Sequence, residues 1–117
     1  MKKFFALYLI PTAVVEEWKK TTSPEKMKVA SDEMMQAWAK WVKDHKKMFV
    51  DEGLPLGKTK RVTAQNISDI KNDMNWYFIM EAESHEAAAK IFQGHPHLQI
   101  PGSSIEVMEI PPMPRMQ

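Results

Sequence analysis

Residues 3–10 of the chain read KFFALYLI, and this stretch decides the fold. In an extended strand, successive side chains point to opposite faces of the sheet. Both faces of this strand are apolar, one made of Phe5, Leu7 and Leu9 and the other of Phe4, Ala6, Tyr8 and Ile10. A strand with one face in water alternates apolar and polar residues. The stretch therefore predicts a central strand that needs cover on both faces.

A long helix is predicted to follow this strand. Residues 13–20 form a short helical turn that Thr12 can cap, and Ser23-Pro24 then starts the main helix, because Ser is favoured at the N-cap and Pro at the first helical position. We expect this helix to run from Pro24 to about Val50, with Gly53 as its stop. Its apolar stripe follows helical spacing: Met27, Ala30, Met34, Trp38, Trp41, Met48 and Phe49. His45 occupies the stripe position between Trp41 and Met48.

The rest of the chain contains turn signals, three further strands and a second helix. In order, we expect a turn at residues 51–57, a strand over 58–64, a long connection over 66–75, a strand over 75–83, a helix from 84 to 94, a loop over 95–102 and a strand over 105–110. The strand over residues 75–83 again has two apolar faces, with Trp76, Phe78 and Met80 on one and Tyr77 and Ile79 on the other.

The order of these elements is β-α-β-β-α-β, which predicts an α+β, ferredoxin-like fold. The first and third strands are central in a four-stranded antiparallel sheet, and two helices cover one of its faces. The second face would be a large exposed apolar patch unless something covers it. We therefore expect a homodimer packed sheet to sheet, a dimeric α/β barrel. The alternative is a monomer whose second face lines a ligand cavity.

Composition bounds the possible functions. A chain of 117 residues allows one domain, residues 1–117, and 44% hydrophobic with 26% charged residues is typical of a globular protein. The net charge of +1 disfavours nucleic-acid binding, and the absence of Cys excludes disulfides and thiolate chemistry. The apolar start, residues 4–10, imitates a signal peptide but lacks a cleavage site. No apolar run reaches the roughly 20 residues that cross a bilayer, so we expect a cytoplasmic protein without membrane contact.

His45 is the candidate residue for proton transfer. A buried imidazole on an apolar stripe can act as a general base, because its ordinary pKa is about 6.5 and small shifts change its charge near neutral pH. The alternative is a core histidine tied to a backbone carbonyl or to a neighbouring acid. One imidazole without a visible partner leaves both interpretations open.

Aromatic side chains and two further histidines are the candidate residues for a ligand pocket. The predicted set is Phe5, Trp38, Trp41, Trp76, Phe78, His95 and His97. The alternative for the aromatics is a role in the core and the dimer interface. His95 and His97 could bind a metal if their segment were extended, but a third ligand is needed and no zinc spacing is present. We expect no metal site and no cofactor; in the alternative, the histidines structure the loop around Pro96.

Three segments also resemble a known family: DEGLPLG at residues 51–57, GHPHL at 94–98 and PGSSIEVMEI at 101–110. They look like small YCII-related proteins of the dimeric α/β barrel superfamily, over most of the chain. The resemblance implies a ferredoxin-like protomer, a dimer and a site between sheet and helix. It also implies a histidine in the first long helix with an acidic partner, which matches His45 with Asp51 or Asp44. The Asp-Gly-Pro-Phe motif of a related branch is absent, and residues 68–73 read SDIKND instead.

The expected function is the binding or transformation of a small, mainly apolar molecule in a pocket between the sheet and the long helix. His45 would then be the general acid or base. Two alternatives stay open at this point. One is a cofactor-free monooxygenase or isomerase, by analogy with other dimeric α/β barrels. The other is a non-catalytic ligand sensor or accessory subunit.

Overall fold

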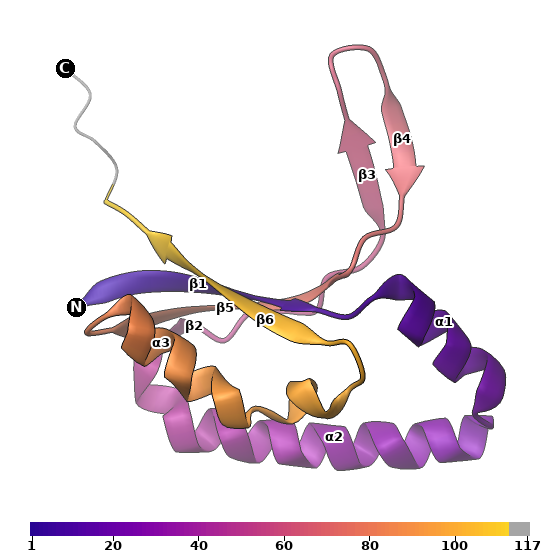
Figure 1. Ribbon diagram of the computed structural model, residues 1–117, viewed down its shortest axis with the longest axis horizontal. Coiled ribbons are helices and arrows are strands. Elements are labelled where there is room, and N and C mark those ends of the chain that lie inside the picture. Colours follow the sequence, from indigo (N-terminus) through magenta and orange to yellow (C-terminus); the bar gives the residue numbers. More distant parts are fainter. Residues whose placement is uncertain (113–117) are drawn as a thin grey trace.

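The computed structural model describes residues 1–112, in which helices lie along one side of an antiparallel sheet (Figure 1). The elements in chain order are β1 (Lys2–Leu9), α1 (Thr12–Thr21), α2 (Pro24–His45), a 3-10 turn (Lys46–Met48), β2 (Phe49–Asp51), β3 (Thr59–Val62), β4 (Ile67–Ile70), β5 (Met74–Ala82), α3 (His85–Ile91), two more 3-10 turns (Phe92–Gly94 and Pro96–Gln99) and β6 (Ser104–Ile110). The end of the predicted domain, residues 113–117, lies outside the described residues.

The main sheet has the strand order β2-β5-β1-β6, and each neighbouring pair is antiparallel. This confirms the predicted α+β class, and the order is compatible with a ferredoxin-like fold. The strands predicted to be central, β1 and β5, are central. In the register Tyr8 lies opposite Trp76 on one side and Ile105 on the other, so these side chains share one face.

Three predicted elements are wrong in detail. The long helix ends at His45 rather than near Val50, and Phe49 pairs with Met80 as part of the short edge strand β2. The expected second strand, residues 58–64, is not in the main sheet. Its counterpart β3 pairs with β4 in a separate hairpin, which rises from the side of the sheet opposite α2 and α3 (Figure 1). Residues 66–75, expected as a connection, hold β4 and the start of β5.

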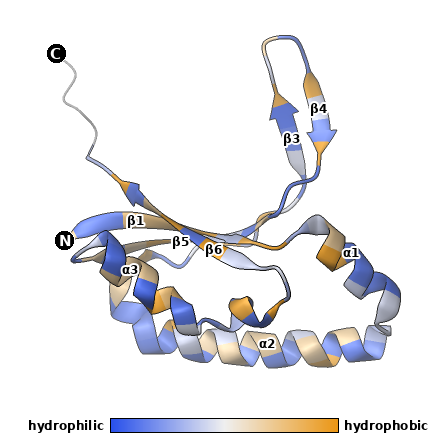
Figure 2. Cartoon of the chain, in the orientation of Figure 1, coloured by the Kyte–Doolittle hydropathy of each residue, from blue (hydrophilic) through white to orange (hydrophobic). Residues whose placement is uncertain are grey.

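The core lies between the sheet and the helices α2 and α3. Its buried members are Phe4, Ala6, Tyr8, Phe78, Met80 and Ala82 from the sheet, with Trp41, Ala88 and Phe92. Helix α2 begins as predicted, since the Ser23 Oγ accepts a hydrogen bond from the Lys26 backbone N–H at 3.3 Å. Figure 2 shows hydrophilic and hydrophobic residues alternating along α2, as expected of a helix with one buried face.

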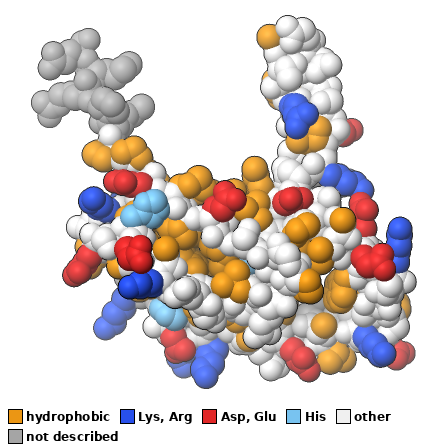
Figure 3. Space-filling model, viewed as in Figure 1, with side chains coloured by type: hydrophobic (Ala, Val, Ile, Leu, Met, Phe, Trp, Pro, Cys, Tyr) orange, Lys and Arg blue, Asp and Glu red, His pale blue; other side chains and the backbone are white. Residues whose placement is uncertain are grey.

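The opposite face of the sheet has an apolar middle, with Lys3, Glu81 and Glu106 also on this face, and no helix lies over it in the described part of the chain (Figure 1). Phe5 stacks on Tyr77 there, with ring centroids 5.7 Å apart, and the register places Ile79 and Met108 beside Phe5. Figure 3 looks onto the edge of the layers, with α2 and α3 below the sheet, and shows hydrophobic side chains gathered in the middle of the molecule. No helix within residues 1–112 is long and apolar enough to span a membrane.

Candidate functional site

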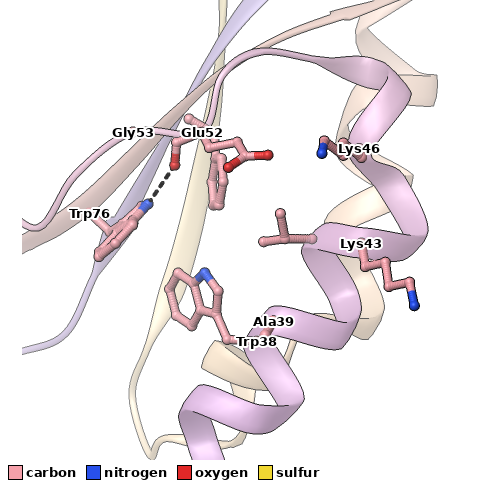
Figure 4. A pocket seen from close by; sticks show the side chains of 9 residues that line it. Trp38, Ala39, Lys43, Lys46, Glu52, Gly53 and Trp76 are labelled. Carbon is pink, nitrogen blue, oxygen red and sulfur yellow. Dashed lines mark hydrogen bonds between the residues drawn. The ribbon is translucent and has the colours of Figure 1, made fainter.

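An opening of about 400 Å³ lies between α2 and the β5 side of the sheet (Figure 4). Four segments line it: α2, the 3-10 turn that follows α2, the loop after β2, and β5. The lining residues are Trp38, Ala39, Val42 and Lys43 from α2, Lys46 from the 3-10 turn, Glu52 and Gly53 from the loop, and Trp76 and Phe78 from β5. Most of the lining is therefore aromatic or aliphatic, with two lysines and one carboxylate.

Two indole rings dominate this pocket. The ring centroids of Trp38 and Trp76 are 5.4 Å apart at an interplanar angle of 61°, an edge-to-face arrangement that aromatic pairs favour. The Trp76 Nε1–H donates a hydrogen bond to the Glu52 backbone carbonyl at 3.1 Å, which fixes that ring (Figure 4). In the same view the Lys43 ammonium points away from both indoles. The inner part of the pocket is thus apolar and held in place.

The loop after β2 reaches β5 because of a glycine. Gly53 has φ of +71°, and a Cβ added there would lie 1.5 Å from the Tyr77 carbonyl oxygen. The Asp51 Oδ1 accepts a hydrogen bond from the Gly53 backbone N–H at 2.8 Å. From the sequence Gly53 was expected to end the long helix; it forms a wall of the pocket instead. The sequence predicts the turn at residues 51–57, but it does not predict the short strand β2 that leads into this turn.

His95 and His97 lie in a buried cluster behind the pocket, at 2% and 1% exposure. The His95 ring centroid is 4.4 Å from those of both Trp38 and Trp41 and 4.9 Å from that of Tyr8. The His97 backbone N–H donates to His95 Nδ1 at 3.0 Å, and the His97 Nε2–H donates to the Leu9 carbonyl at 3.0 Å. Both imidazoles thus bond to the backbone, as the loop-structuring alternative expects: His95 within the loop, and His97 to the end of β1.

Burial keeps this cluster uncharged. It lowers the pKa of His95 to about 3, with smaller contributions from the nearby His97 and His45 imidazoles. Burial also lowers the pKa of His97, against the opposing effect of the Leu9 carbonyl, and it raises the pKa of Tyr8. All three groups are therefore neutral at pH 7.

His45 and Asp51, the predicted catalytic pair, have separate partners. His45 does not line the pocket; its Nδ1–H donates to the Trp41 carbonyl at 2.8 Å, and its ring stacks on the Trp41 ring at 4.4 Å. Asp51 bonds to Gly53 and accepts from the Tyr77 hydroxyl at 3.5 Å. His45 has the carbonyl partner of the core alternative, and its role in proton transfer stays a prediction.

The predicted pocket residues separate into three groups. Trp38, Trp76 and Phe78 line the opening together. Trp41, His95 and His97 belong to the buried cluster behind it. Phe5 lies on the other face of the sheet, because its neighbours Phe4 and Ala6 face the helices. Phe5 is therefore not part of this pocket. Within residues 1–112, no three His, Asp or Glu side chains are grouped as a metal ion would require.

No protein-family model matches this chain, and no curated protein matches it either. The resemblance to YCII-related proteins therefore stays a prediction. The function has to be argued from the chemistry of the pocket.

Proposed function

We propose that this protein binds a small, mainly apolar aromatic molecule between α2 and the sheet. The observation that carries the proposal is the opening of about 400 Å³ lined by Trp38, Trp76 and Phe78. Small-molecule sites are typically concave, mostly apolar and about 300–1,000 Å³ in volume. A planar apolar ligand would stack on or against the two indoles and remove their apolar surface from water.

The lining supports binding in preference to proton transfer. Its titratable groups are Lys43, Lys46 and Glu52, whereas His45 lies outside it. Binding without conversion fits the ligand sensor or accessory subunit that the sequence left open. The resemblance to YCII-related proteins, which we retain as part of the proposal, implies a site in the same place, between sheet and helix.

We also propose that the functional unit is a homodimer with its sheets packed face to face. The chain exposes 9035 Å² of surface, whereas a compact monomer of this mass exposes about 6,600 Å². Its radius of gyration is 16.6 Å, against about 13 Å for a compact domain of this length. A stable interface buries about 800 Å² per partner, so the uncovered apolar face and the projecting β3–β4 hairpin offer ample area for a second copy.

The binding proposal can be tested with the four indole N–H signals of the protein. We choose α-methylstyrene as the probe, because it is planar, apolar and small enough for the pocket. In a two-dimensional ¹H–¹⁵N NMR titration, the Trp38 and Trp76 signals are expected to shift saturably. The Trp18 signal should not move, because Trp18 lies on the exposed helix α1 and serves as an internal control.

Replacing Trp76 should weaken this binding. Trp76→Leu removes most of one aromatic wall, and the lost apolar contact is expected to raise the Kd for α-methylstyrene about tenfold. The matched control is Trp18→Leu, for which the Kd should not change. Equal effects of the two substitutions, or an absence of saturable shifts at Trp38 and Trp76, would show that the pocket is not an aromatic binding site.

A further inference from the structure

Two buried polar atoms lack a hydrogen-bond partner among the described residues. They are the Tyr8 hydroxyl and the His95 Nε2, which belong to side chains 0% and 2% exposed. Buried polar groups in folded proteins are almost always hydrogen-bonded, because an unpaired one loses its bonds to water without replacement. These two atoms belong to neighbouring rings with centroids 4.9 Å apart, so one group from outside the described residues could pair with both of them.

The hydrogen-bond network fixes the proton on His95. Its Nδ1 accepts from the His97 backbone N–H, so Nδ1 itself carries no hydrogen. A neutral imidazole has one N–H, which must then be on Nε2. His95 Nε2 is thus a donor only, and the Tyr8 hydroxyl is a second donor beside it. His95 Nε2–H requires a hydrogen-bond acceptor, and the same acceptor could take the hydrogen of the Tyr8 hydroxyl, which can both donate and accept.

These two donors lie directly behind the wall of the pocket. The Trp38 ring lines the pocket, and its centroid is 4.4 Å from that of His95 and 5.1 Å from that of Tyr8. Phe78 likewise lines the pocket and lies 5.4 Å from the Tyr8 ring, centroid to centroid. The Trp38 indole thus separates the pocket from Tyr8 and His95, neither of which lines it, so a ligand that reaches the two donors must displace this indole.

We propose that the Tyr8 hydroxyl and the His95 Nε2–H together bind the carbonyl oxygen of an aromatic ketone or aldehyde, with its ring in the pocket beside Trp76. This inference rests on the proposed function and names the substrate class of the same site. A carbonyl oxygen has two lone pairs and can accept from both donors at once.

A neutral carbonyl fits better than a carboxylate. The neighbours of the two donors are aromatic rings, and His97 is neutral because burial lowers its pKa. The groups whose charge shifts the His95 pKa are the imidazoles of His97 and His45, with no lysine or arginine among them; of the two pocket lysines, Lys43 belongs to the last turn of α2 and Lys46 to the 3-10 turn after it. A carboxylate here would lose its hydration without gaining a countercharge, which is costly in an apolar interior.

The test compares acetophenone with α-methylstyrene, in which a methylene group replaces the carbonyl oxygen at nearly the same shape. Tyr8→Phe removes one donor and keeps the ring, so it is expected to raise the Kd for acetophenone about tenfold and to leave that for α-methylstyrene unchanged. Tyr77→Phe is the matched control: Tyr77 is the only other tyrosine and lies on the opposite face of the sheet, so both Kd values should stay as they were.

Two spectroscopic readouts report on the donors directly. The infrared C=O stretch of bound acetophenone should lie below its frequency in an apolar solvent, and Tyr8→Phe should move it back toward that frequency. The ¹⁵N signal of His95 Nε2 should shift with acetophenone but not with α-methylstyrene. A C=O stretch unchanged from apolar solvent, or an equal effect of Tyr8→Phe on both probes, would overturn the inference, for instance because the donors hold a water molecule.

The same experiment separates this inference from the proposed function. If both probes bind at Trp38 and Trp76 but Tyr8→Phe does not discriminate between them, the aromatic pocket stands and the carbonyl site is wrong. If neither probe binds, the proposed function is wrong and the inference is overturned with it.

Discussion

The Tyr8 hydroxyl group should lower the stability of the ligand-free protein. The Tyr8 oxygen is fully buried without a partner within residues 1–112, so it costs stability in the ligand-free protein. Tyr8→Phe is expected to raise the free energy of unfolding by about 1 kcal/mol, measured by urea denaturation at pH 7. Tyr77→Phe, a change at a hydroxyl that bonds weakly to Asp51, should have an effect within about 0.5 kcal/mol. A loss of stability in Tyr8→Phe would mean that the hydroxyl is bonded in solution.

His95 makes stability depend on pH. Its pKa in the folded protein is about 3, mainly because of burial, whereas an unfolded histidine has about 6.5. Above pH 6.5 both states are neutral and the full stability is present. As the pH falls below 6.5, only the unfolded state binds the proton, so stability is lost progressively toward pH 3. Between pH 6.5 and 5 this loss should be about 1.5 kcal/mol for His95 alone.

The measurement is urea denaturation over that pH range, in which few carboxyl groups titrate. His95→Phe cannot take up a proton, so this variant should show a flatter dependence on pH whatever its stability at pH 7.5. An unchanged slope would indicate that His95 is not held neutral in the folded protein.

At the scale of the element, the loop after β2 determines the shape of the pocket. Gly53→Ala would place a Cβ 1.5 Å from the Tyr77 carbonyl oxygen, so the loop must move away from β5 and weaken the bond between Trp76 Nε1–H and the Glu52 carbonyl. We expect a loss of about 2 kcal/mol in the free energy of unfolding and about tenfold weaker α-methylstyrene binding. Gly57→Ala is the matched control, because no heavy atom lies within 4 Å of its added Cβ. Similar behaviour of the two variants would contradict this role of Gly53.

The long elements were predictable because their signals are local. The Ser23-Pro24 start of α2 and the two-faced strands β1 and β5 follow from residue type and spacing. So does the start of α3, where the Ser84 Oγ accepts a hydrogen bond from the Ala87 backbone N–H at 3.1 Å. The short strand β2 gave no such signal, since Phe49 fits the apolar stripe of the preceding helix equally well. The sequence did not reveal that β3 pairs with β4 outside the main sheet. Which strands pair depends on contacts between distant residues, and residue type and spacing do not show these contacts.

The candidate site was predictable only in part, for the same reason. Helical spacing places Trp38 on the buried stripe of α2, and strand alternation places Trp76 and Phe78 on one face of β5. The sequence therefore predicts that these three side chains lie between the helix and the sheet. The bond of His97 to the Leu9 carbonyl joins residues 88 positions apart, so no spacing in the sequence reveals it. The proton position on His95 depends in turn on the 3-10 turn (Pro96–Gln99) that this contact holds in place. The two buried donors therefore appear only once the fold is known.

At the scale of the whole molecule, the uncovered sheet face allows a direct test of the proposed dimer. Met108 lies on this face at the outer strand β6 and is 39% exposed within one chain, so a lysine there should not disturb the fold of the protomer. In a two-fold dimer, Met108→Lys would bury two charges against apolar side chains. We expect the dissociation constant of the dimer to rise at least about 100-fold.

Sedimentation velocity at micromolar concentrations provides the measurement. The unmodified protein should sediment at twice the chain mass of 13.6 kDa, and Met108→Lys should sediment at the chain mass with an unchanged circular-dichroism spectrum. Met35→Lys is the matched control, because Met35 is 69% exposed on the long helix α2. It should stay dimeric, since α2 lies on the other side of the sheet (Figure 1). An unmodified protein that sediments at the chain mass would exclude the dimer, and the aromatic pocket would then have to function within one chain.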